Sequence, residues 1–190
     1  NKNLIKFFYV CVFAVISVIL YGLLQYVTGF SIFGSVYDNY RITLFGDERF
    51  IGHYLVRLIP IVFALVLLFF SDSKIKIFLL MLILITSDLL IFISGERTSF
   101  FMISLFTVLV LLLVSKWKLI RIISIFVSTV LIIFVLNSNI SIKERMFYQT
   151  INQTGSAVTF SLEHDLLFES AYNMFLDNQI FGVGPKIFRL

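Results

Sequence analysis

The stretch "DLLIFISGERTSFFMISL" (residues 88–105) contains two apolar runs that flank an adjacent acid and base, Glu96 and Arg97. Each run extends far enough to approach the length that a helix needs to cross a bilayer, about 20 apolar residues. The stretch therefore predicts two membrane-spanning helices joined by a very tight turn. Both charged side chains can reach the lipid headgroups from such a turn, so their presence alone assigns no function to Arg97.

The composition of the whole chain indicates that lipid is its solvent. Of the 190 residues, 59% are hydrophobic and 14% are charged, and the mean hydropathy is +1.01. A soluble domain of this length needs more polar surface than that. The net charge of +4 does not indicate a nucleic-acid partner, because the Lys and Arg residues lie between apolar runs and form no basic stripe. Cys11 is the single cysteine, so there is no disulfide framework.

The hydrophobic pattern predicts an all-α fold, a polytopic integral membrane bundle with about five transmembrane helices and an amphipathic helix near the C-terminus. Pro60 lies inside the second span and is expected to kink it. We expect a transmembrane bundle over 1–136 with an outer loop at 25–53, followed by an outer segment over 137–190. The expected spans are 4–24, 54–70, 77–94, 99–114 and 120–136.

The distribution of basic residues predicts the orientation of these spans. With the N-terminus in the cytoplasm, the basic residues of the inner segments outnumber those of the short outer loops, as the positive-inside rule requires. The loop at 25–53 and the segment 137–190 then lie outside the cytoplasm. The inner basic residues are Lys2, Lys6, Lys74, Lys76, Lys116, Lys118 and Arg121, and the outer ones are Arg41, Arg49 and Arg97.

Three arginines, Arg41, Arg57 and Arg97, are expected at the outer membrane boundary, together with Gly52. A guanidinium group is a permanent bidentate donor suited to phosphate, and a glycine permits close approach of the backbone. The three arginines would form a cationic pocket for a diphosphate at the lipid surface. The alternative for Arg41 is a loop arginine paired with a nearby acid.

Asp88 lies about two turns inside the third span, where an unpaired carboxylate is costly. Arg57 is at a compatible depth and is the expected partner. Asp88 is interpreted as a structural ion pair, with direct work on substrate or protons as the alternative.

An amphipathic helix is expected over 161–178, with Leu167 and Phe168 on its apolar face. His164 falls on that face near the helix N-terminus, which disfavours the imidazolium and leaves a neutral ring able to accept a proton. His164 is thus the candidate catalytic base, and a buried structural histidine is the alternative. His53 is the weaker candidate. No metal site is expected, because the histidines and the cysteine lie far apart.

Three stretches occur in order between the apolar spans: "RITLFGDERFIGHYLVRLIP" (41–60), "SGERTSFF" (94–101) and "EHDLLFESAYNMFLDNQIFGVGPKIFR" (163–189). Together they resemble the bacterial O-antigen polymerase and O-antigen ligase superfamily. The resemblance implies a glycosyltransferase of the bacterial inner membrane, with residues 25–53 and 137–190 in the periplasm. The implied donor is a glycan on undecaprenyl diphosphate, and the acceptor is another glycan or the lipid A core.

The same resemblance implies no cofactor, and it names membrane lipids, a flippase and a chain-length regulator as further partners. Arg41 and Arg97 match the diphosphate-binding arginines, and the spacing of Arg41 and Gly52 favours a polymerase. The family's histidine base follows the Gly-Pro segment, whereas this chain stops at Leu190. We therefore expect a fragment of a longer protein, inactive by itself.

Two other functional classes remain open. A transporter or flippase of lipid-linked or anionic solutes would use the same arginines, but it should also carry broken helices or ionisable residues near the bilayer midplane. Arg121 is counted with an inner segment. Spans four and five are then expected to have no ionisable residue, and span three only Asp88. A purely structural membrane subunit would not require arginines at three span ends.

Overall fold

The computed structural model describes residues 2–29, 31, 42–43, 50–69, 74–148, 151, 162–179 and 182. The chain divides into two compact units, Asn1–Lys143 and Glu144–Leu190. Every regular element in the described residues is helical. The first unit contains α1 (Lys2–Thr28), α2 (Ile51–Phe69), α3 (Lys74–Ile93), α4 (Arg97–Leu113), the 3₁₀ turn η1 (Ser115–Trp117), α5 (Lys118–Ser138) and α6 (Ile140–Lys143).

The five predicted spans are confirmed as helices α1 to α5. Four of them, α1, α2, α3 and α5, are long and apolar enough to cross a membrane. Helix α4 is also apolar but has 17 residues, a length of about 25 Å at the rise of an α-helix. The protein is a multi-pass helical membrane protein. Helix α2 continues through Pro60 without interruption.

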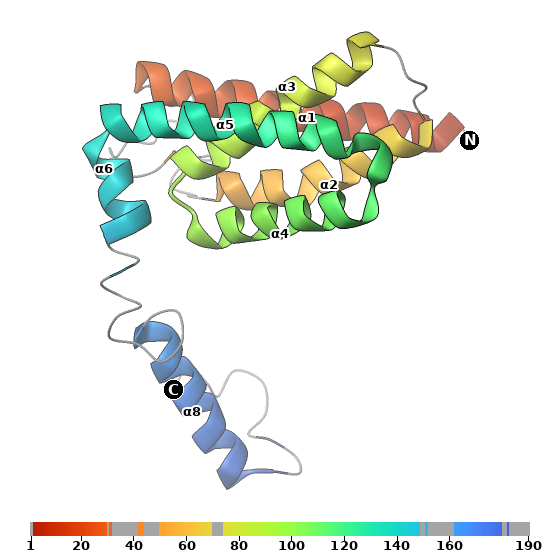
Figure 1. The fold of residues 1–190 in the computed structure, drawn as a ribbon. Helices are drawn as coiled ribbons and strands as arrows, with labels where there is room; N and C mark the ends of the chain where they lie inside the picture. The colour runs from red at the N-terminus through yellow and green to blue at the C-terminus, as the bar shows by residue number, and fades with distance from the viewer. Residues whose placement is uncertain are drawn as a thin grey trace. The chain divides into compact units, whose positions relative to one another are not determined.

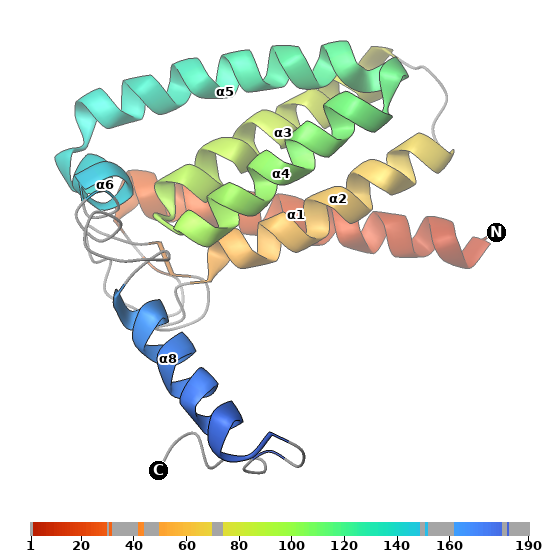
Figure 2. The same ribbon diagram turned by 60° about the horizontal axis from the view of Figure 1, so that its bottom comes forward.

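Helices α1 to α5 run in alternating directions, and α3 contacts each of the other four (Figure 1). Figure 2 shows α4 passing beside α3 and α2 in the turned view. Helices α2 and α4 begin, and α1, α3 and α5 end, at one end of this bundle, on the left in Figure 1. We call it the Glu96 end, after the residue that precedes α4.

The side chains sort between the bundle core and its surroundings as lipid requires. Leu84, Leu90 and Ile91 of α3 have no exposed surface, because α3 is surrounded by neighbours. By contrast, Phe13 of α1 is 73% exposed and Phe126 of α5 is 70% exposed. Large apolar side chains that point outward on spanning helices are stable only against lipid tails.

A small residue allows three helices to meet closely. A Cβ atom at Gly22 of α1 would lie 2.7 Å from Leu90 Cδ2 of α3 and 2.9 Å from Ile51 Cδ1 of α2. Small residues at helix interfaces let backbones approach in membrane proteins, where packing replaces the hydrophobic effect between helices. Gly22 therefore sets the spacing of α1, α2 and α3 near the Glu96 end.

The segment between α1 and α2 is tied to α1. Gln25 is fully buried; its Nε2 donates to Thr43 Oγ1 at 3.0 Å, and its Oε1 accepts from Thr43 N at 3.1 Å. The neighbouring Ile42 is also buried. Helix α1 continues through Thr28 and α2 begins at Ile51, so helical residues occupy both edges of the expected loop at 25–53.

The second unit contains the π-helical turn η2 (Glu144–Tyr148) and α8 (Leu162–Asp177). Helix α8 confirms the helix predicted over 161–178. It ends in a turn at Asn178, whose backbone N–H bonds the carbonyl of Met174 at 3.2 Å.

Candidate functional site

The turn between α3 and α4 is built by the motif Ser94-Gly95-Glu96. Gly95 has a φ of 68°, a left-handed conformation that glycine adopts without steric cost. Its N–H bonds the carbonyl of Phe92 at 3.1 Å, which closes the end of α3 as glycine C-caps commonly do. The chain therefore reverses within a few residues and presents Glu96 at the first turn of α4.

The Glu96 side chain does not cap its own helix; it caps α2. Its Oε1 accepts the backbone N–H of Gly52 at 2.7 Å, and its Oε2 accepts that of His53 at 3.1 Å. Ser99, one turn into α4, donates its hydroxyl to Oε2 at 2.9 Å. A carboxylate at a helix N-terminus satisfies unpaired N–H groups and complements the helix dipole. Glu96 is 5% exposed, so these bonds are sheltered.

Gly52 makes this cap possible. A Cβ at this position would lie 3.0 Å from Ser94 Oγ and 3.1 Å from the Glu96 carboxyl carbon and Oε2. These distances are tighter than ordinary contacts, and both neighbours are buried. Gly52 was expected to allow a substrate close to the backbone. The group that approaches it in the structure is the Glu96 carboxylate.

His53 is held on three sides. Its Nδ1 is in hydrogen-bond contact with Glu96 Oε2 and lies 3.1 Å from Ser99 Oγ. The Phe50 ring meets the imidazole edge to face, with 5.7 Å between ring centroids. The His53 side chain is 35% exposed, against 4% for Glu96. The imidazole is therefore fixed through Nδ1 while about a third of the side chain stays exposed.

His53 lines a pocket of about 300 Å³ together with Phe50, Tyr54 and Arg57. Pockets for whole drug-sized ligands span about 300–1,000 Å³, so this one suits a phosphate or a single sugar ring. Arg57 follows His53 by one helical turn and is exposed. Its guanidinium makes no ion pair or hydrogen bond within the described part of the chain.

The other predicted binding residues are placed as follows. Arg97 is the first residue of α4 and is partly exposed, directly after Glu96. Arg41 lies outside the described residues, while Thr43, two residues further on, is hydrogen-bonded to Gln25 of α1. Arg57 and Arg97 therefore share the Glu96 end with the Glu96–His53 cluster.

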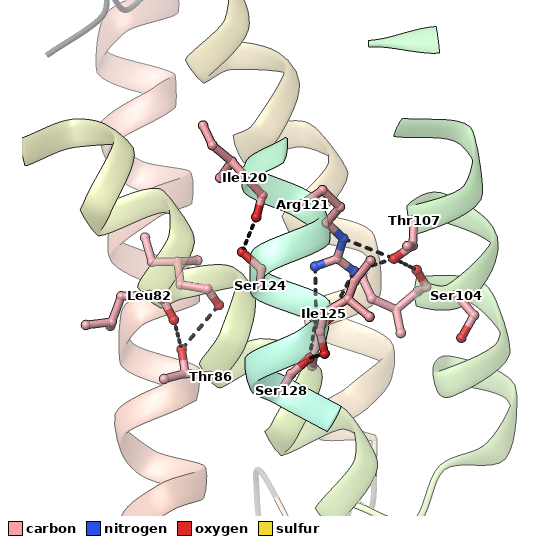
Figure 3. Close-up of polar contacts among 12 residues, drawn as sticks. Leu82, Thr86, Ser104, Thr107, Ile120, Arg121, Ser124, Ile125 and Ser128 are labelled. Atoms are coloured by element: carbon pink, nitrogen blue, oxygen red, sulfur yellow. Dashed lines mark hydrogen bonds and ion pairs between the residues drawn. The ribbon is translucent and has the colours of Figure 1, made fainter. Parts of the chain in front are cut away.

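Asp88 is paired, but the expected partner Arg57 is wrong. Arg121 of α5 donates from Nη1 to Asp88 Oδ2 at 2.8 Å and from Nη2 to Oδ1 at 3.1 Å. The guanidinium also bonds Thr107 of α4 through Nε at 3.1 Å, the contact drawn in Figure 3. Ser128 of α5 adds a weaker hydroxyl bond to Asp88 at 3.4 Å. Arg121 is 1% exposed, so a residue assigned to an inner segment lies inside the bundle.

The backbone of His164 lies in α8, at the third position of the helix. Its side chain lies outside the described residues, and α8 belongs to the second unit. The role of His164 as a base stays a prediction. The described residues contain no group of three or more His, Cys, Asp or Glu that could hold a metal ion.

The Glu96–His53 pair and the burial of Arg121 were missed by the sequence. Glu96 and His53 are separated by 43 residues, and no local spacing links them. The available signals were the Gly-His pair at a helix start and an acid directly after a glycine turn. Arg121 was expected to face water, as basic residues near a span end commonly do, so its burial was not predicted.

Comparisons with family models, with curated proteins and with solved structures found no match to this chain.

Proposed function

We propose that this chain is part of an O-antigen polymerase or ligase type of glycosyltransferase in the bacterial inner membrane. The donor is a glycan carried on undecaprenyl diphosphate, and the reaction takes place on the periplasmic face. The observation that carries the proposal is that Arg57 and Arg97 stand at the same bundle end as a buried Glu96 and a half-open His53. The motif resemblance at 41–60, 94–101 and 163–189 supports the substrate class.

The residue types suit the chemistry of a diphosphate leaving group. Negative charge grows on the leaving phosphate as the glycosidic bond breaks, and fixed guanidinium groups stabilise such charge best where water is scarce. Arg57 has no acid attached to it among the described residues, so it is available to an anion in the adjoining pocket. The pocket is too small for an oligosaccharide, so the proposal puts the phosphate or the first sugar in the pocket and the rest of the glycan outside it.

The test replaces Arg97 by Lys or Ala in the full-length gene, expressed in a strain that lacks its own copy. Lysine keeps the charge but loses the bidentate fork. We expect both variants to accumulate normally in membranes while surface polysaccharide on a gel shortens to single repeat units. Thr98→Ala, at the exposed next position of α4, is the matched control and should give the wild-type ladder.

The pattern in which surface polysaccharide is lost distinguishes a polymerase from a ligase, and it also shows whether the proposal fails. Single repeat units attached to the lipid A core indicate a polymerase. Long chains that no longer reach the core indicate a ligase. Wild-type ladders from both Arg97 variants would leave Arg97 as a charge at the headgroups and would contradict the proposal.

The buried Asp88–Arg121 pair favours a second candidate, a transporter or flippase of lipid-linked or anionic solutes. Charged groups inside a helical bundle commonly mark solute or proton pathways. This candidate predicts that loss of the pair stops lipid-linked repeat units from reaching the periplasm, whereas the glycosyltransferase proposal predicts that they arrive and remain unpolymerised. Accessibility of the lipid-linked glycan to an external lectin distinguishes the two.

A further inference from the structure

We infer that His53, oriented by Glu96, is the general base that activates the acceptor hydroxyl, in place of the histidine that the family resemblance puts after the Gly-Pro segment; this inference rests on the proposed glycosyl transfer. The groups around Glu96 determine where the Nδ1 proton points. Four donors converge on the Glu96 carboxylate: the N–H groups of Gly52 and His53, the Ser99 hydroxyl and the His53 ring. An ionised carboxylate can only accept, so Nδ1 carries the hydrogen in this contact.

The other ring nitrogen of His53, Nε2, is free to accept a proton. With the hydrogen on Nδ1, the Nε2 atom of a neutral imidazole has a free lone pair. Within the described part of the chain, Nε2 has no hydrogen-bond partner. The ring lines the pocket beside Arg57. A carboxylate that orients an imidazole through Nδ1, leaving Nε2 toward the substrate, is the arrangement by which histidine acts as a base in many hydrolases and transferases.

The His53 imidazole is also held rigidly. Glu96 is itself fixed by the first turn of α2, and Phe50 meets the imidazole in a T-shaped ring contact. His53 is thus anchored by its own helix and by the turn between α3 and α4. A catalytic group held in this way loses little freedom when substrate binds.

The proposed reaction transfers the glycosyl group from the lipid diphosphate to the acceptor hydroxyl. The acceptor hydroxyl gives its proton to His53 Nε2 as its oxygen bonds the anomeric carbon of the donor sugar. The bond from that carbon to the phosphate oxygen breaks, and its electron pair leaves on the lipid diphosphate. Arg57 lies one turn from His53 and offsets the charge of the leaving group. The proton on His53 later passes to water or to the released diphosphate.

The experiment uses the purified full-length protein and, as donor, lipid-linked repeat units isolated from the strain that lacks the gene. His53→Ala should lower turnover by about 100-fold or more, the usual contribution of a general base. Binding of the donor, measured separately, should stay within about 3-fold of the wild type, since the general base acts on the acceptor rather than on the diphosphate. Added imidazole should restore part of the turnover, which a purely structural role would not allow. Ile61→Ala, a partly exposed position two turns along α2, is the matched control.

Glu96→Gln tests the positioning role and covers the case in which His53→Ala fails to fold. The amide keeps the size of the side chain but no longer fixes the Nδ1 hydrogen. We expect kcat to fall while KM for the donor stays unchanged.

The outcomes separate the inference from the proposed function. Wild-type protein that consumes no lipid-linked repeat unit overturns the proposed function, and with it this assignment. Turnover that survives His53→Ala, or that is lost together with donor binding and is not restored by imidazole, overturns the assignment alone. Loss of turnover in His164→Ala with His53→Ala unaffected would place the base in the second unit instead.

Discussion

At Gly52 the absence of a side chain allows the Glu96 carboxylate to reach the backbone of α2. Gly52→Ala places a Cβ 3.0 Å from Ser94 Oγ and 3.1 Å from the Glu96 carboxyl group. We expect this overpacking to destabilise the protein by about 1–2 kcal/mol. The measurement is reversible unfolding in mixed micelles.

Helix propensity alone predicts that Gly52→Ala stabilises the protein, so the sign of the measured change in unfolding free energy distinguishes the two effects. Alanine is favoured over glycine in a helix by about 1 kcal/mol. Ala64→Gly, at an exposed position of the same helix, measures that propensity without a neighbouring carboxylate. A more stable Gly52→Ala protein would mean that Glu96 moves freely away from α2, contrary to the structure.

At the scale of single residues, the sequence predicted the turn between α3 and α4 but not the contacts that this turn makes. The tight turn at Glu96 and Arg97 followed from two apolar runs, because hydropathy changes sharply at a span end. The need for a small residue at Gly52 was also foreseen, but its cause was not. The partner of Gly52 lies 44 residues away, and only the packing of α2 against the α3–α4 turn brings the two together.

At the scale of the helix, the pair between Asp88 and Arg121 joins α3 to α5, and Thr107 adds α4. Arg121→Met leaves a buried carboxylate without its cation, which typically costs about 3–5 kcal/mol. Adding Asp88→Leu to the same chain should recover most of that loss, because an apolar pair of similar volume needs no compensation. Unfolding in mixed micelles measures both proteins.

Lys118→Met is the matched control for this pair, since Lys118 is an exposed cation at the start of α5. It should leave the free energy of unfolding nearly unchanged. A double variant as unstable as Arg121→Met would show that the arginine stabilises α5 through Thr107 and packing rather than through Asp88.

Hydropathy predicted the helices α1 to α5 but not the faces that they turn to one another. Depth in the membrane can be estimated from distance to a span end, and on that basis Arg57 suited Asp88. Rotation about the helix axis and the choice of neighbour are not encoded in depth. Arg57 faces outward from α2, whereas α5 lies against α3 and brings Arg121 within reach.

For the whole molecule, the open question is which side of the membrane holds the Glu96 end. The positive-inside rule predicts that this end lies outside the cytoplasm, because the opposite end carries most of the lysines. The proposed reaction needs that orientation, since the acceptor glycan and the His53 pocket must share a compartment. Ser138, at the end of α5, lies at the Glu96 end of the bundle, and Ser115 of η1 lies at the other end. Both serines are exposed.

Single cysteines at these two positions test the orientation. In cells with an intact inner membrane, a membrane-impermeant maleimide should label Ser138→Cys and leave Ser115→Cys unlabelled until the membrane is opened. The parent protein sets the background, and Cys11 should add little to it because its side chain is buried in α1. Labelling of Ser115→Cys alone would invert the topology and place His53 and Arg57 in the cytoplasm. The periplasmic transfer would then be excluded, while the Glu96–His53 geometry would still require a substrate on the cytoplasmic side.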